Sequence, residues 1–260
     1  MGKWGKGMSV LIPNLAGYNI SVLDKVVLTN PLPENVGGLI TVIKQFKVKE
    51  IWDTLDPEVF TKRMTYDEFL EELADVRIDV QRQKELAVGI YLNYYEFMDS
   101  GIQEVIGKEY KQAGLKKILA EKKIHRRHLV KGTILHTEDV AGKQFRISVL
   151  NPPEERISGT QSDISNNSAV IKLTYGARSI LLCSNIMAEG EGMLVYEYAD
   201  ELKSDVMLVP DHGSGLASSE KFINTVRPEY AIVQYGYLRS RSFAEAELNR
   251  KLQKYYDKEI

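Results

Sequence analysis

The chain has 260 residues, of which 43% are hydrophobic and 27% charged, and its formal net charge is −2. These values are typical of a soluble globular protein, and the global charge gives no sign of a nucleic-acid partner, although a local basic patch remains compatible with it. The single cysteine, Cys183, excludes an intrachain disulfide and a cysteine-based zinc cage. No apolar run reaches about 18 residues and no signal peptide is visible, so we expect a cytoplasmic protein with no membrane partner.

The first part of the chain is predicted to alternate strands with a helix. Pro and Asn are frequent after residue 28, and Gly37 and Gly38 open an apolar segment with helical spacing over residues 39–46. The expected strands cover residues 9–12, 20–23, 25–28 and 48–52. This strand–helix–strand order favours a mixed α/β sheet.

Residues 56–123 change character and are predicted to be mostly helical. Helix-period patterns occupy residues 66–74, 81–99 and about 109–122, and aromatic side chains crowd residues 91–98. Packing onto the main domain is the favoured explanation of these aromatic residues. The alternative is a surface for a protein partner or for a second copy of the chain.

The densest basic run follows at His125-Arg126-Arg127-His128, with Lys131 close behind. A solvated strand edge is the favoured interpretation. Contact with a phosphate backbone is the alternative. The candidate residues for nucleic-acid binding are Arg126, Arg127, Lys131, Arg239 and Arg241.

The second half again alternates strands and helices. A hairpin is predicted with its turn at Gly176-Ala177, and a buried strand ends at Pro210-Asp211-His212-Gly213-Ser214. The expected strands are 144–150, 169–175, 179–183, a stretch before Pro210 and 230–234, and the expected helices are 186–199, 218–226 and 243–256.

Several fragments in this order resemble the metallo-β-lactamase fold, in particular the hydrolase-like domain of ComEC-type DNA-uptake proteins. They are Gly5-Lys6-Gly7-Met8-Ser9, Val26-Val27-Leu28-Thr29, Val36-Gly37-Gly38, Ser162-Asp163, Asn166-Asn167-Ser168, Ala188-Glu189-Gly190-Glu191, and Asp205 to His212-Gly213-Ser214. The resemblance implies one domain over residues 1–260, a four-layer αββα sandwich in the α/β (α+β) class, and a helical insertion at about 61–106. It also implies a dinuclear metal site and phosphodiester hydrolysis in active members.

Carried over residue by residue, the resemblance places altered side chains at the metal site. The ligand positions of the first loop fall on Asn30, Leu32, Glu34 and Asn35, the shared carboxylate on Asn185 and a histidine on Asp211, while His212 is retained. Zinc prefers imidazole nitrogen and carboxylate ligands, which amides and an alkyl chain do not replace.

Three hypotheses follow. The favoured one is a catalytically inactive binding or scaffolding module that needs no cofactor, with a partner or second copy on the helical insertion. The second is a phosphodiesterase or nuclease with an oxygen-rich site, in which Asp211 and His212 are catalytic candidates. The alternative cofactors are Mg²⁺, Mn²⁺ or Zn²⁺, and such a site suits Mg²⁺, Mn²⁺ or Ca²⁺ better than Zn²⁺. The candidate ligands for that site are Glu34, Asn35, Asp163, Asn185, Asp211 and His212. The third is a nucleic-acid-binding module that uses the basic residues.

Overall fold

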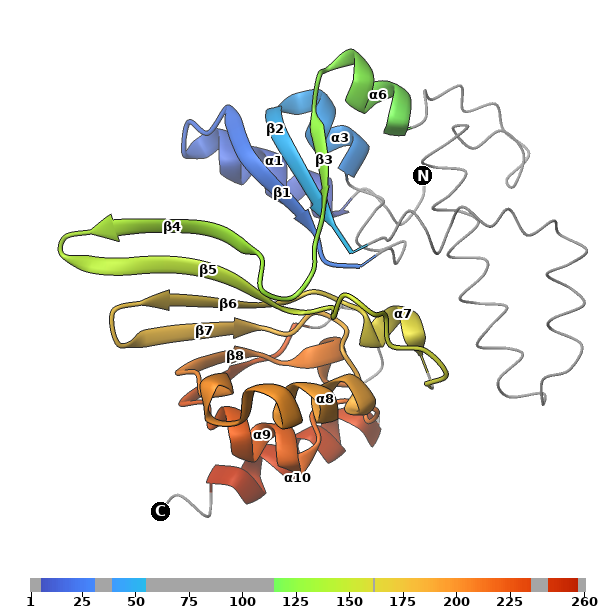
Figure 1. The fold of residues 1–260 in the computed structure, drawn as a ribbon, viewed down its shortest axis with the longest axis vertical. Coiled ribbons are helices and arrows are strands. Elements are labelled where there is room, and N and C mark those ends of the chain that lie inside the picture. The colour runs from blue at the N-terminus through green and yellow to red at the C-terminus, as the bar shows by residue number, and fades with distance from the viewer. Residues whose placement is uncertain (1–5, 31–38, 55–114, 161, 235–242, 257–260) are drawn as a thin grey trace, which may run out of the picture. The chain divides into compact units, whose positions relative to one another are not determined.

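The computed structural model describes residues 6–30, 39–54, 115–160, 162–234 and 243–256. The chain divides into two compact units, Met1–His128 and Leu129–Ile260 (Figure 1). Each unit contains one sheet accompanied by helices, so the predicted mixed α/β class with two sheets is confirmed. The four-layer stacking of the sheets and the single domain over 1–260 stay predictions. The insertion at 61–106 lies outside the described residues.

The sheet of the first unit has the order β1-β2-β3, and its neighbouring strands are parallel. Its described elements are α1 (Lys6–Gly17), β1 (Val22–Leu28), α3 (Leu39–Gln45), β2 (Lys47–Asp53), α6 (Leu115–Glu121) and β3 (His125–His128). The predicted strand–helix–strand step is therefore confirmed by β1, α3 and β2. Because parallel neighbours point the same way, the residues after β1, β2 and β3 emerge at one edge of the sheet.

The strand predicted over residues 9–12 is wrong, because this segment lies inside helix α1. Ile12 and Leu15 are three residues apart, and both pack against the core of the first unit, as the same face of a helix does. A short apolar run cannot be assigned to strand or helix by periodicity alone, and Pro13, which lies inside this helix, usually signals a break. The resemblance of residues 5–9 to a strand of the metallo-β-lactamase fold is therefore not supported.

The core of the first unit lies between the sheet and its helices. Ile43 of α3 and Ile51 of β2 are almost fully buried, and Ile118 and Leu119 of α6 join the same cluster. Helix α6 is further held by the ammonium of Lys122, which donates to the carbonyl oxygen of Ile43 at 2.7 Å. Burial of these side chains supplies the hydrophobic stabilisation of this unit.

The sheet of the second unit has the order β4-β5-β6-β7-β8-β9, antiparallel from β4 to β7 and parallel from β7 to β9. Its elements are β4 (Ile134–Val140), β5 (Lys143–Asn151), α7 (Asp163–Asn166), β6 (Val170–Tyr175), β7 (Arg178–Leu182), α8 (Ala188–Tyr198), η2 (Ala199–Leu202), β8 (Val206–Leu208), η3 (Pro210–Gly213), α9 (Glu220–Val226), β9 (Tyr230–Ile232) and α10 (Phe243–Tyr256). The predicted hairpin, its Gly176 turn and the closing helix are confirmed. Strand β4 and helix α7 were not predicted.

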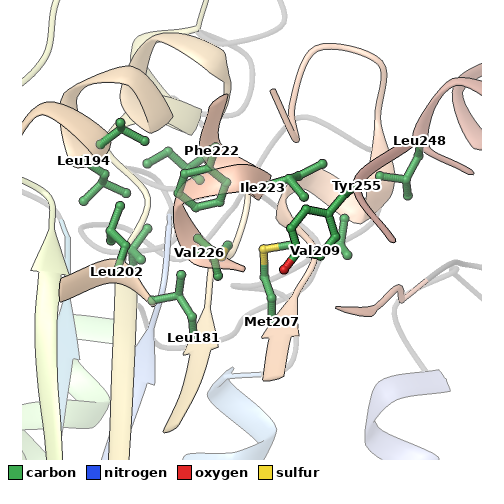
Figure 2. Packing of buried hydrophobic residues seen from close by; sticks show 14 residues of the cluster. Leu181, Leu194, Leu202, Met207, Val209, Phe222, Ile223, Val226, Leu248 and Tyr255 are labelled. Atoms are coloured by element: carbon green, nitrogen blue, oxygen red, sulfur yellow. The ribbon is translucent and has the colours of Figure 1, made fainter. Parts of the chain in front are cut away.

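Helices α8, α9 and α10 form the core of the second unit with strands β7 and β8. Figure 2 shows Leu181 and Met207 from these strands pointing into the same cluster as Leu194, Phe222 and Tyr255 from the helices. Four apolar residues of α10 join this cluster, and they are Leu248, Leu252, Tyr255 and Tyr256. The spacings of four and three residues from Leu248 to Leu252 and on to Tyr255 place these side chains on one face of the helix. None of the described helices is long and apolar enough to span a lipid bilayer.

Candidate functional site

Two polar side chains meet where the parallel strands β7 and β8 end. Leu182 and Leu208 are paired in the last register position of these strands, so the residues that follow emerge side by side. The amide nitrogen of Asn185 donates to Oδ1 of Asp211 at 3.1 Å. Asn185 is buried and Asp211 is half-buried. These two candidate residues are therefore adjacent in the structure.

The turn after β8 holds Asp211 and His212 in a left-handed backbone conformation. Their φ angles are 45° and 54°, which non-glycine residues adopt rarely and at a cost of about 1–3 kcal/mol each. The backbone N–H of Asp211 donates to the carbonyl oxygen of Ser184 at 2.8 Å, which ties this turn to the turn after β7. Gly213 continues the turn with φ 77°, and a Cβ there would lie 2.5 Å from Cδ2 of Leu248. The turn therefore needs glycine at this position.

His212 is oriented by the third parallel strand. Its Nδ1 lies 3.0 Å from the carbonyl oxygen of Gln234, which follows β9. A carbonyl oxygen only accepts hydrogen bonds, so this geometry places a proton on Nδ1. Nε2, the other ring nitrogen, takes no part in this bond. Gln234 acts through its backbone, so no side-chain pattern in the sequence could have indicated it.

These residues do not fit a dinuclear zinc centre. The Asn185 amide directs an N–H group at the carboxylate of Asp211, whereas a cation needs oxygen or nitrogen lone pairs directed at it. In the described parts of the chain, no group of three or more His, Cys, Asp or Glu side chains is arranged to hold a metal ion. Leu32, Glu34 and Asn35 lie outside the described residues, and Asn30 is fully buried directly after β1.

Asp163, another candidate ligand, closes a local turn. Its carboxylate accepts from the backbone N–H groups of Gly159 and Thr160 and from the Thr160 hydroxyl, at 3.1, 2.8 and 2.7 Å. These bonds occupy both carboxylate oxygens. The geometry therefore favours a structural role for Asp163.

Two buried polar side chains hold the segments around this site. Asn166 accepts at its Oδ1 from the backbone N–H groups of Met187 and Gly190, both at 3.1 Å, and so caps the start of α8. The carboxylate of Glu191 accepts from the backbone N–H groups of Ser218 and Ser219 at 2.5 and 2.8 Å. Burial raises the pKa of Glu191 above its ordinary value, although these bonds oppose the shift. Both residues belong to fragments of the family resemblance, but the sequence alone did not indicate their roles.

The three candidate residues for nucleic-acid binding that the structure describes are all paired with carboxylates. Arg126 binds Asp53 through two N–H groups at 2.6 and 2.9 Å, and Lys131 binds Glu197 at 2.7 Å. Arg127 donates to Glu50 at 3.1 Å and its guanidinium lies 5.5 Å from the centroid of the Trp52 ring. Phosphate would have to compete with these partners. Arg239 and Arg241 lie outside the described residues, and nucleic-acid binding stays a prediction.

No family model matches the chain. The chain is 36% identical to competence protein ComA of Neisseria gonorrhoeae over 75 residues. These residues are 29% of this chain and 11% of that protein. It is 24% identical to ComE operon protein 3 of Bacillus subtilis (strain 168) over 230 residues. These residues are 88% of this chain and 22% of that protein. The uncharacterized protein YcaI of Escherichia coli (strain K12) is 32% identical over 76 residues, which covers 29% of this chain and 10% of that protein.

The chain has a distant similarity to two solved structures. CmlA, a diiron β-hydroxylase from Streptomyces venezuelae, matches with a TM-score of 0.42 and 11% identity over 92% of this chain and 42% of that one. Zn²⁺-bound PqqB from Methylobacterium extorquens matches with a TM-score of 0.35 and 10% identity over 88% of this chain and 69% of that one. At these TM-scores, neither structure bears on the chemistry of this chain. The chain spans about a tenth to about a fifth of the length of the competence proteins and YcaI, and its similarity to ComE operon protein 3 extends over most of its residues.

Proposed function

We propose that this chain is a non-catalytic binding or scaffolding module related to the competence proteins. The support for the relation is the 24% identity to ComE operon protein 3 over 88% of this chain. The support for the absence of hydrolysis is the hydrogen bond between Asn185 and Asp211. This observation carries the proposal, because it occurs where the family resemblance implies a carboxylate that two metal ions share.

The chemistry of phosphodiester hydrolysis explains why this one bond matters. Two metal ions clamp the attacking and leaving oxygens and generate hydroxide at neutral pH, and each ion needs several anionic or imidazole ligands. Asn185 contributes no charge, and its N–H group occupies one lone pair of Asp211. Leu32, at another implied ligand position, has no donor atom at all.

The direct test is metal analysis of the purified protein together with a nuclease assay in Mg²⁺, Mn²⁺ or Zn²⁺. We expect bound metal well below one equivalent and no cleavage of single- or double-stranded DNA above a protein-free blank. The Asp211→Ala variant should behave as the wild type does. About one equivalent of metal, with cleavage that Asp211→Ala and His212→Ala both abolish, would contradict the proposal.

One observation favours a second candidate, an oxygen-rich site for a hard cation. Asn185 and Asp211 are already adjacent, and rotation of the Asn185 amide would direct its oxygen toward a shared ion. This candidate predicts that Mn²⁺ raises the melting temperature of the wild type and that Asp211→Ala removes the effect. The matched control is Asp200→Ala, because Asp200 is an exposed aspartate paired with Arg227 and lies away from this site in the fold. An equal response of both variants would exclude the cation site.

A further inference from the structure

Strand β4 forms an open edge of the sheet in the second unit. It pairs antiparallel with β5, and among the described strands it has no second neighbour. The β4–β5 hairpin extends as an arm beyond the turn that joins β6 and β7 (Figure 1). Within the described part of the chain, the backbone groups of β4 that point away from β5 therefore pair with no other strand.

The outer half of β4 also lacks burial on both of its faces. All five residues of 136–140 are exposed. His136, Glu138 and Val140 lie on one face of the strand, and Thr137 and Asp139 lie on the other. The irregularity of the ladder lies before His136, so the segment 136–140 is a regular strand. It contains no proline and no lysine, and its charged residues Glu138 and Asp139 disfavour pairing with a strand that does not complement them. A strand that buries neither face gains little from its own sheet and is suited to pair with another strand.

The charge pattern of this segment indicates which strand fits. In an antiparallel pair of two identical strands centred on Thr137, His136 of one copy lies opposite Glu138 of the other. The contact occurs twice because the arrangement has two-fold symmetry, and Thr137 faces its own counterpart. His136 and Glu138 already approach each other within one strand, with Nε2 and Oε2 3.4 Å apart. The second copy would extend this contact into a group of four side chains in which histidine and glutamate alternate, and each contact is an ion pair only when the imidazole is protonated.

We propose that β4 pairs antiparallel with β4 of a second copy of this chain, with the two-fold axis at Thr137. The interface is distinct from the helical insertion at 61–106 and needs neither metal nor hydrolysis, so it stands independently of the proposed function. A pair of short strands buries less than about 1,200 Å², the lower end of standard interfaces. The dimer is therefore weak and forms at high protein concentration.

Cysteine crosslinking tests this register directly, because the native Cys183 is buried. Residues directly opposite in an antiparallel pair have Cβ atoms about 4.5–5.5 Å apart, near the range that a disulfide spans. We expect Thr137→Cys to form a disulfide-linked dimer under mild oxidation. Mixing His136→Cys with Glu138→Cys should also crosslink. The control is Gln144→Cys, which is also exposed but lies on the inner strand β5.

Charge substitutions provide a readout that needs no oxidation, by sedimentation velocity over a range of protein concentrations. His136→Glu places like charges opposite Glu138 at both symmetric positions and should weaken self-association about tenfold. The exchange His136→Glu/Glu138→His should restore it, whereas Thr174→Glu, on strand β6 of the same sheet, should leave it unchanged. Crosslinking of Gln144→Cys equal to that of Thr137→Cys would overturn the proposal. So would a wild type that stays monomeric at every concentration, which would leave this edge for a strand of a different protein.

Discussion

At the scale of single residues, Asn185 determines what the turns after β7 and β8 can do. Replacing it by aspartate exchanges the N–H donor for a second carboxylate about 3 Å from Oδ1 of Asp211. We expect Asn185→Asp to lose about 1–3 kcal/mol of unfolding free energy at neutral pH, because two like charges cannot both stay ionised there without cost. Millimolar Mn²⁺ should recover much of this loss, as measured by thermal unfolding with and without the ion.

The control for this prediction is Asn185→Ala, which removes the same hydrogen bond without adding charge. Its loss of stability should be insensitive to Mn²⁺. If the aspartate variant also ignores Mn²⁺, the two side chains are not aligned to share a cation. The amide at position 185 would then not account for the inactive site that we propose.

Glu191 is a second residue with a measurable signature, because burial raises its pKa above the ordinary value of 4.5. A raised pKa in the folded state means that the stability contributed by this carboxyl is complete below pH 4.5 and declines as the pH rises through the raised value. Glu191→Gln is neutral at every pH and cannot show this decline. Urea unfolding of both proteins between about pH 4 and about pH 8 should therefore show the advantage of the wild type shrinking as the pH rises. A constant difference would contradict the shift.

The sequence placed Asn185 and Asp211 in one candidate site but did not indicate how they bond. Asn185 and Asp211 follow neighbouring parallel strands, and that order alone indicates that they meet. The direction of the Asn185 amide depends on local geometry that no spacing encodes. The backbone carbonyl of Gln234 and the capping role of Asn166 depend on long-range contacts as well. The sequence therefore favoured an inactive site over a cation site on the loss of ligand types alone, without indicating the bond between these two side chains.

At the scale of elements, helix α8 offers a matched pair of glycines. Gly190 lies against the core, and a Cβ there would be 2.7 Å from Cγ1 of Ile186 and 3.0 Å from Oδ1 of Asn166. Gly192 has nothing within 4 Å of its Cβ position. We expect Gly190→Ala to destabilise the protein by about 1–3 kcal/mol and Gly192→Ala to stabilise it by about 0.5–1 kcal/mol, by chemical denaturation. Equal effects at both positions would show that Ile186 and Asn166 do not pack against Gly190 as closely as described.

Elements with a clear periodicity were predicted well, and elements without one were not. Helix α10 was predicted with its observed bounds because its apolar residues recur at helical spacing, and the β6–β7 hairpin was indicated by its Gly176 turn. Strand β4 was missed because residues 136–140 are exposed on both faces and so carry no alternation. The segment 9–12 was misassigned because a short apolar run suits a strand and a helix equally.

At the scale of the whole molecule, the two units have separate hydrophobic cores and separate sheets. Ile43 is completely buried in the cluster of the first unit, and Phe222 is completely buried in that of the second. Replacing either by alanine removes packing and leaves a cavity, at a cost of about 2–5 kcal/mol. Because the two residues belong to different clusters, each substitution should weaken mainly its own unit.

Hydrogen exchange followed by mass spectrometry resolves these two effects within the intact chain. Ile43→Ala should accelerate exchange in β1, β2 and α3 and leave β6 to β9 protected, and Phe222→Ala should do the reverse. The amount of acceleration reports the local opening free energy, so the expected change is about 30-fold or more for a loss of about 2 kcal/mol. If either substitution accelerates both sheets equally, the cores unfold together, and the prediction of one cooperative domain over residues 1–260 is the correct description.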